Sequence, residues 1–96
     1  MFVIFEGGSP AYVIEVGEDF TLECPSTSSA GIVWWHNNER LVLKGEVSPA
    51  VRHRVSFNNT TGALTIHGAR LADSGTYYCG SPFDDKPVIN VTVVGN

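Results

Sequence analysis

Short runs of alternating apolar and polar residues cover most of the chain, and turn-forming residues interrupt them about every 8 to 12 positions. The clearest run is Phe20-Thr21-Leu22-Glu23-Cys24, whose apolar side chains stand at every second position. Because neighbouring side chains of a β-strand point to opposite faces, this run predicts a strand with one buried face. Repeated short strands without a helical period predict an all-β sandwich or barrel. Strands are expected at 3–6, 12–16, 20–24, 32–36, 40–43, 54–57, 64–66, 76–79 and 88–94, and an irregular segment at 44–53.

Alternation also separates two adjacent tryptophans. Trp34 has the same parity as Ile32, and the inward side chains of the 20–24 strand need apolar partners, so we expect Trp34 in the core. Trp35 then points out of the sheet, on the same side as Val33. On the 76–79 strand the same argument turns Tyr78 outward.

Composition bounds the class of protein. Ninety-six residues predict one domain, 1–96, and 43% hydrophobic with 17% charged residues exclude disorder. A net charge of −4 with six Lys and Arg argues against nucleic acid and anionic membranes as partners. Apolar runs stay well below the ~18 residues of a membrane span, so we expect no direct membrane insertion by this segment. The start Met1–Phe5 is too short for a signal peptide, so we expect a leader before Met1 and more sequence after Asn96.

Two cysteines, Cys24 and Cys79, suggest a disulfide, the alternative being two reduced thiols of a cytosolic protein. Sequons at Asn58, Asn59 and Asn90 favour the same secreted or surface setting as a disulfide does, because N-glycosylation takes place in secreted and surface proteins. We therefore expect an extracellular location, either secreted or as the ectodomain of a membrane protein.

Three features converge on one fold. Cys24 and Cys79 lie 55 positions apart, a tryptophan follows Cys24 after ten positions, and Asp73-Ser74-Gly75-Thr76-Tyr77-Tyr78-Cys79 fits the pattern D-x-G-x-Y-x-C. A disulfide between inward positions can join two sheets packed about 10 Å apart, and the indole of Trp34 fills the space beside the sulfurs.

The residues before the second cysteine form a predicted corner. Tyr77 points inward, and its hydroxyl can bond back to the preceding chain, while Gly75 permits the tight turn. Asp73 is a short acceptor that fixes the corner, and we expect Arg54 to be its partner.

With these motifs, the chain resembles a variable-type or intermediate-type domain of the immunoglobulin superfamily, over nearly the whole length from Val16 to Val93. The resemblance implies a two-sheet antiparallel sandwich with one inter-sheet disulfide. It further implies a receptor or adhesion ectodomain that binds a cell-surface or secreted protein, homophilic pairing being one version. Such domains require no cofactor, and none is expected here.

The chain departs from this family at its end and in its middle. Residues 80–96 lack the Phe-Gly-x-Gly bulge of antibody and T-cell-receptor variable domains, which argues against pairing in the antibody manner. The cysteine spacing is shorter than in most antibody variable domains, so the middle strands are expected to be abbreviated. Residues 80–85 also do not fit the pattern of muscle-type intermediate modules.

Partner binding is assigned to Val33, Trp35 and Tyr78, because exposed aromatic side chains on a sheet are unusual. The alternative is that Trp35 is covered by residues 41–43 or by a following domain. Phe83, an apolar residue in the loop 81–87, is a second candidate, unless it folds back onto the sandwich edge.

Asn90 is expected on the same outer face as Trp35, where a glycan would shield part of it. The alternatives are that Asn90 is unoccupied or lies at the rim. Asn58 and Asn59 belong to a turn at the opposite sheet, as a glycan site or simply as a polar turn.

The sequence shows no arrangement of residues that is typical of a catalytic or metal site. His36, His53 and His67 match no zinc spacing, and Ser74 has no histidine placed as its base. The carboxylates show no calcium ligand set. We therefore expect a recognition module and not an enzyme, the alternatives being a structural spacer in a multi-domain chain or a secreted immune-modulatory decoy.

Overall fold

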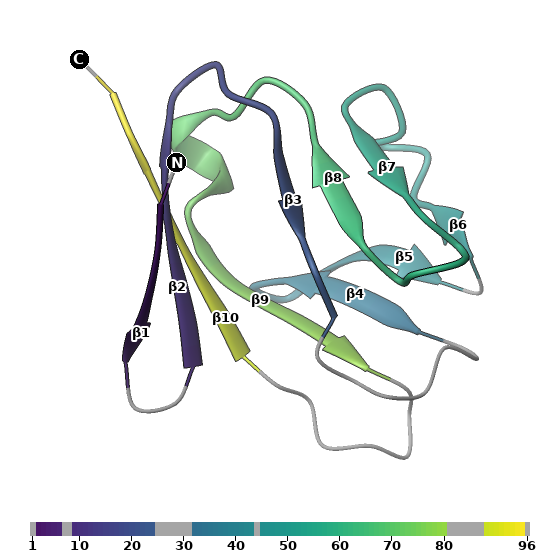
Figure 1. Cartoon of the computed structure of the whole chain (residues 1–96). Coiled ribbons are helices and arrows are strands. Elements are labelled where there is room, and N and C mark those ends of the chain that lie inside the picture. The colour runs from purple at the N-terminus through teal and green to yellow at the C-terminus, as the bar shows by residue number, and fades with distance from the viewer. Residues whose placement is uncertain (1, 7–8, 25–31, 44, 81–87, 96) are drawn as a thin grey trace.

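The computed structural model describes residues 2–6, 9–24, 32–43, 45–80 and 88–95, which form two packed β-sheets (Figure 1). The first sheet has the strand order β1 (Phe2–Glu6), β2 (Ser9–Glu15), β10 (Val88–Val94), β9 (Gly75–Gly80), β4 (Val33–His36), β5 (Glu39–Leu43) and β6 (Glu46–Val47). The second sheet has the order β3 (Phe20–Leu22), β8 (Leu64–Ile66) and β7 (Val55–Phe57). A single 3-10 turn, η1 (Leu71–Asp73), precedes β9. The all-β sandwich predicted from the alternation is confirmed.

The larger sheet is mixed, whereas a wholly antiparallel sandwich was expected. β2 pairs in parallel with β10, from Ala11 opposite Asn90 to Glu15 opposite Val94. The cause is connectivity, because the chain leaves β2 for the second sheet and returns to β2 only through β10, which runs in the same direction.

The segment 44–53, expected to be irregular, contains a short strand. Val47 of β6 pairs with Val42 of β5, and Gly45 makes the intervening turn with a φ of +78°. A backbone in that region is easily reached only by glycine. The two-residue strand is too short to show alternation in the sequence, which is why the pattern missed it.

The core lies between the sheets and follows the predicted parity. Trp34, Leu22 and Tyr77 have no solvent exposure, and β10 alternates with Ile89, Val91 and Val93 inward. The outward side chains of β10, Asn90 and Thr92, are exposed.

One disulfide joins the two sheets. Cys24, which follows β3, is bonded to Cys79 of β9 with a Cα–Cα distance of 5.7 Å, so the predicted pairing is confirmed. Trp34 stands directly opposite Cys79 in the β4–β9 register, and its indole therefore lies beside the bridge. No helix among the described residues is long and apolar enough to cross a membrane.

Candidate recognition face

A row of four side chains crosses the outer face of the seven-stranded sheet. Val88 of β10 stands opposite Tyr78 of β9, Tyr78 opposite Trp35 of β4, and Trp35 opposite Arg40 of β5. Directly opposite residues of paired strands share one face and contact each other. Val88, Tyr78 and Trp35 are half-buried and Arg40 is exposed. We call these four residues the aromatic row.

Trp35 reaches this face because its neighbour Trp34 fills the core. Trp34 is fully buried, and its Nε1 donates a 2.9 Å hydrogen bond to the carbonyl of Gly62, which satisfies the only polar atom of the indole. With Trp34 fixed inward, the strand alternation turns both Trp35 and Val33 outward. Val33 is half-buried and stands opposite Gly80.

The end of β4 is held in place by Asn37. Its φ of +54° lies in the left-handed region, and its Oδ1 accepts a 3.1 Å hydrogen bond from the N–H of Thr76. Its own N–H donates to the carbonyl of Thr76 at 2.7 Å. Asn37 and Asn38 line, together with Trp35 and Tyr78, a hollow of about 270 Å³ on the outer face. The turn thus forms a wall of the candidate site.

A larger hollow of about 480 Å³ lies on the other side of Trp35, against β5, β6 and the chain that follows. Arg40 and Arg52 supply positive charge to its lining and Glu46 supplies negative charge, while Leu43 and Val47 supply apolar surface. The Nη2 of Arg52 donates to the Val47 carbonyl at 3.4 Å, which directs this side chain along the hollow. Here the sheet face can take up apolar groups and pair with charged ones.

Arg40 and Arg52 were missed by the sequence analysis. A bulge between Trp34 and Trp35 shifts the β5 register, so that Trp34 stands opposite Val42 and Trp35 opposite Arg40. Leu41 and Val42 are consequently both buried, and simple alternation along β5 fails. The adjacent pair Leu41-Val42 was the only signal of this bulge in the sequence.

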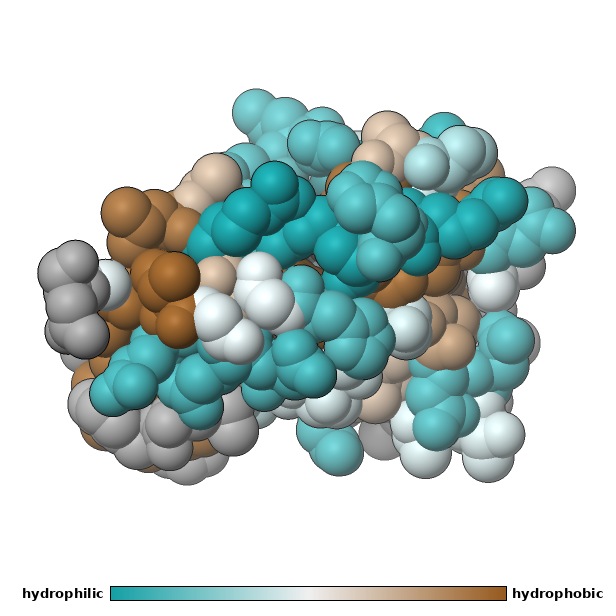
Figure 2. Space-filling view, turned by 90° about the horizontal axis from the view of Figure 1, so that it is seen from above, coloured by the Kyte–Doolittle hydropathy of each residue, from teal (hydrophilic) through white to brown (hydrophobic). Residues whose placement is uncertain are grey.

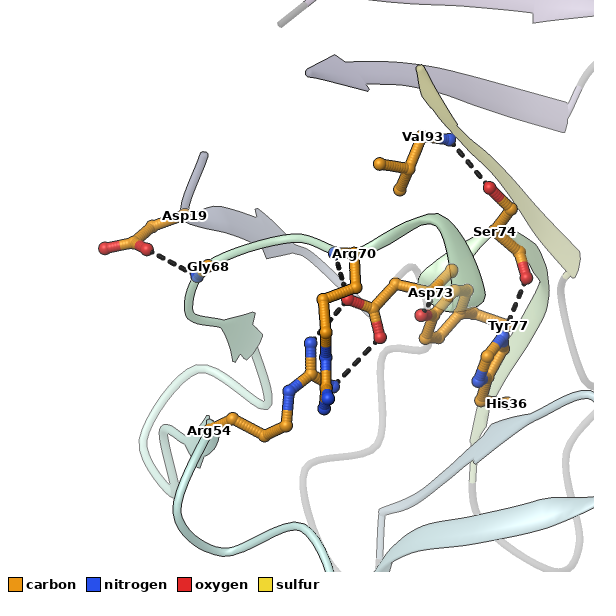
Figure 3. Close-up of polar contacts among 9 residues, drawn as sticks. All are labelled: Asp19, His36, Arg54, Gly68, Arg70, Asp73, Ser74, Tyr77 and Val93. Atoms are coloured by element: carbon orange, nitrogen blue, oxygen red, sulfur yellow. Dashed lines mark hydrogen bonds and ion pairs between the residues drawn. The ribbon is translucent and has the colours of Figure 1, made fainter. Parts of the chain in front are cut away.

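A buried ion pair anchors the strand that carries Tyr78 (Figure 3). The Arg54 guanidinium donates to both carboxylate oxygens of Asp73, with Nη1 to Oδ1 at 2.9 Å. The main-chain N–H of Arg70 donates to Asp73 Oδ2 at 2.8 Å, and the hydroxyl of Tyr77 donates to the Asp73 carbonyl at 2.7 Å. The expected pairing of Arg54 with Asp73 and the expected tyrosine corner are both present.

These contacts set the ionisation of the corner. Burial by itself would raise the pKa of Asp73, but the hydrogen bonds from Arg54 and Arg70 and the charge of Arg54 outweigh it and hold the pKa below its ordinary value. Burial, and then the Asp73 charge, raise the pKa of Tyr77. Asp73 is therefore a charged structural acceptor whose oxygens are engaged.

His36 joins this corner, which the sequence did not indicate. Its ring stacks on that of Tyr77 with 4.3 Å between centroids and 10° between planes, and its Nε2 lies 3.0 Å from the Ser74 carbonyl. The Ser74 hydroxyl accepts a 2.8 Å hydrogen bond from the N–H of Val93. Both side chains therefore tie β4, β9 and β10 together beneath the face. No group of three or more His, Cys, Asp or Glu among the described residues could hold a metal ion.

The sequons lie on different parts of the surface. Asn90 is exposed on the outer face of β10, two residues from Val88 of the aromatic row. Asn58 is exposed, and its Oδ1 accepts hydrogen bonds from the N–H groups of Thr60 at 2.8 Å and Thr61 at 3.2 Å, so it shapes its own turn. Asn59 is exposed beside it. Phe83 lies outside the described residues.

Known proteins that are similar to this chain in sequence or in structure agree with this fold. The sequence model of a family described as immunoglobulin domain matches residues 4–80. The uncharacterised protein ORF9 of fowl adenovirus A serotype 1 is 31% identical over 91 residues, covering 83% of this chain and 28% of the viral protein. Mouse V-set and immunoglobulin domain-containing protein 10 is 39% identical over 70 residues, covering 68% of this chain and 12% of the mouse protein. The chain thus spans less than a third of the length of either relative.

Among solved structures, the ZIG-8 IG1 homodimer is similar with a TM-score of 0.76 and 14% identity. The match covers 97% of this chain and 85% of the ZIG-8 chain. At this identity the likeness concerns the fold alone.

Proposed function

The chain belongs to the immunoglobulin domain family, and we propose that it is an extracellular module that binds another protein through the outer face of its seven-stranded sheet. The observation that carries this proposal is the aromatic row, which brings Val88, Tyr78, Trp35 and Arg40 together from four adjacent strands. The module acts by binding and not by catalysis.

The side-chain types of this face are those that carry binding energy in protein interfaces. Trp, Tyr and Arg are enriched among residues whose truncation costs more than about 2 kcal/mol of binding. Trp35 and Tyr78 are half-buried, so a partner that covers them removes apolar surface from water while ordering few additional rotamers. Arg40 and Arg52 beside them favour a partner that presents carboxylates.

An extracellular setting agrees with the chemistry of the chain. The Cys24–Cys79 bridge persists in an oxidising compartment. The exposed Asn90 sequon is proposed as a glycan site that flanks the aromatic row. A glycan there would leave the partner only the part of the outer sheet face that lies away from β10. Asn58 and Asn59 are proposed as sites remote from the face. The whole protein that contains this module would be a cell-surface receptor or adhesion protein.

The partner is either a second copy or a different surface protein. The fold accommodates both versions, since the ZIG-8 IG1 domain forms a homodimer and, with RIG-5, a heterodimer. Sedimentation of the chain and of Trp35→Ala over a range of concentrations, together with a binding screen against secreted and surface ectodomains, separates the two versions, because pairing through the face should be lost in Trp35→Ala.

The test of the face compares two alanine variants in the same assay. Trp35→Ala removes the centre of the aromatic row and should weaken partner binding at least about tenfold, while the fold persists. Thr21→Ala is the control, because Thr21 is exposed on the outer face of the opposite sheet. If Trp35→Ala and the control bind equally well, the face is assigned wrongly. If neither a second copy nor any screened protein binds, the recognition function itself is contradicted.

A secreted decoy is a second candidate, and the similarity to an adenovirus protein over 83% of this chain favours it. A decoy would use the same face to occupy one member of a pair of host surface proteins. Its test is competition: the chain should block binding between those two proteins, and Trp35→Ala should not. Binding to one member without displacement of the other would contradict the decoy.

A further inference from the structure

β1 is an unprotected sheet edge. It is the first strand of the seven-stranded sheet, paired on one side with β2, and no described residue pairs with its other side. The N–H and C=O groups along such an edge form a template for another strand. Figure 1 shows β1 as the outermost strand of the sheet, beside β2.

The other three edges among the described strands are short. β6 at the far end of the same sheet has two residues, and β3 and β7 at the edges of the second sheet have three each. β1 has five. Short edges are one of the usual protections against strand pairing, so β1 differs from every other described edge in lacking it.

The first four residues of β1 lack the remaining protections, and the one charge of the strand is Glu6 at its end. Phe2-Val3-Ile4-Phe5 contains no charge and no proline, the two residue types that usually block pairing along an edge. Val3 is 41% exposed and Ile4 is 42% exposed, and as consecutive strand residues they lie on opposite faces of the sheet. Seen from above, Figure 2 shows hydrophobic surface on the side of the molecule that β1, β2 and β10 occupy in Figure 1, to which the exposed Val16, after β2, and Val94, at the end of β10, also belong.

The four residues read almost the same in both directions. An antiparallel copy centred between Val3 and Ile4 would set Phe2 opposite Phe5 of the second copy and Val3 opposite Ile4 of the second copy. The pair of Val3 and Ile4 joins two β-branched residues, a type that stabilises cross-strand contacts. A strand with charges of one sign at these positions would set like charges opposite each other in this arrangement. Residues 2–5 of β1 carry no charge, so no such repulsion arises between them.

We propose that β1 is a self-association edge, at which two copies of the chain pair their β1 strands antiparallel and join their seven-stranded sheets into one. This contact is separate from the aromatic row, which lies on the face of the sheet and not at its edge. Two copies joined in this way would keep both recognition faces open and present them as a bivalent unit. The proposal does not depend on the recognition function.

The test is sedimentation of the chain up to about 1 mM, because an edge contact buries less than the ~1,200 Å² of stable interfaces and is expected to be weak. The mass should rise towards twice that of one copy as the concentration increases. Hydrogen exchange at the same concentrations should show added protection of the β1 amides. A monomer at every concentration, or a dimer without added protection in β1, would overturn the proposal.

A matched pair of variants locates the contact. Val3→Lys places a charge on the edge strand and should shift the dimer to monomer. Val94→Lys is the control, because Val94 is 42% exposed, nearly as Val3 is, but lies on β10, which is not an edge. Both variants should melt within a few degrees of the original chain. Loss of the dimer in both, or in neither, would overturn the assignment to β1. Trp35→Ala should leave this dimer intact, which keeps the result distinct from homophilic pairing through the face.

Discussion

The hydroxyl of Tyr77 donates a 2.7 Å hydrogen bond to the main-chain carbonyl of Asp73, four residues earlier, while the carboxylate of Asp73 is held by Arg54. Asp73 thus accepts hydrogen bonds through both its main-chain carbonyl and its side-chain carboxylate. The corner before β9 is fixed from two directions, and β9 carries both the disulfide and Tyr78 of the aromatic row.

Tyr77→Phe should lower the free energy of unfolding by about 1–3 kcal/mol, because it leaves a buried carbonyl without its donor. Urea unfolding measures the change. Tyr78→Phe removes a hydroxyl from the half-buried outer position next in the chain and should change the free energy by only about 0.5 kcal/mol or less. Equal losses in both variants would contradict a special role for the Tyr77 bond.

Asp73→Asn should cost about 3 kcal/mol, because it leaves the Arg54 guanidinium largely buried without its counter-charge. Adding Arg54→Met should recover part of this loss, since the uncompensated charge is then gone. Chemical denaturation of the two single variants and the double variant gives the coupling. Additive losses would show that the pair contributes nothing as a pair.

Acid should weaken the fold through the same carboxylate. The pKa of Asp73 is lower in the folded chain than its ordinary value, so the unfolded chain binds more protons in acid. The stabilisation is complete above the ordinary pKa of about 3.9 and is lost as pH falls from there through the lower folded pKa. Unfolding free energies measured from pH 7 to pH 2 should therefore fall below about pH 4.5, and the fall should be shallower in Asp73→Asn. Parallel curves for the two proteins would place the acid sensitivity in other carboxylates. The next candidates are the exposed Asp19 and the half-buried Glu18, whose pKa values are also lowered.

Reduction of the Cys24–Cys79 bridge should remove roughly 4 kcal/mol, by the entropy of closing a loop over 55 positions. For a domain of this size that corresponds to a fall in Tm of more than about 15 °C. Calorimetry with and without reductant measures it. The double variant Cys24→Ala/Cys79→Ala serves as the control, because reductant should not change its Tm. An unchanged melt of the original chain on reduction would contradict a stabilising bridge.

The residues that could be predicted are those whose positions depend on local periodicity and on one motif. Trp34 and Trp35 separate by strand parity, and the inward side chains of β10 alternate without interruption. Asp73 belongs to the motif before Cys79, and Arg54 was expected as its partner at the start of a neighbouring strand. Apart from that pairing, each of these inferences needs only the order of residues along one strand or one turn.

The features that could not be predicted depend on relations between strands. The parallel pairing of β2 with β10 is set by how the chain crosses between sheets, which no local pattern encodes. The bulge opposite Trp34 and Trp35 is a register shift, and it alone brings Arg40 into the aromatic row. The unpaired edge of β1 likewise became visible only from the strand order, in which no described strand lies beyond β1.

The two adjacent tryptophans also differ as light emitters. Trp34 stands opposite Cys79, beside the disulfide, and an excited indole next to a disulfide loses its energy by transferring an electron to the sulfurs. Trp35 points to the other side of the sheet, away from the bridge, and should escape this quenching. We therefore expect the intrinsic emission of the folded chain to arise mainly from the centre of the aromatic row, which makes it an optical probe of the proposed recognition face.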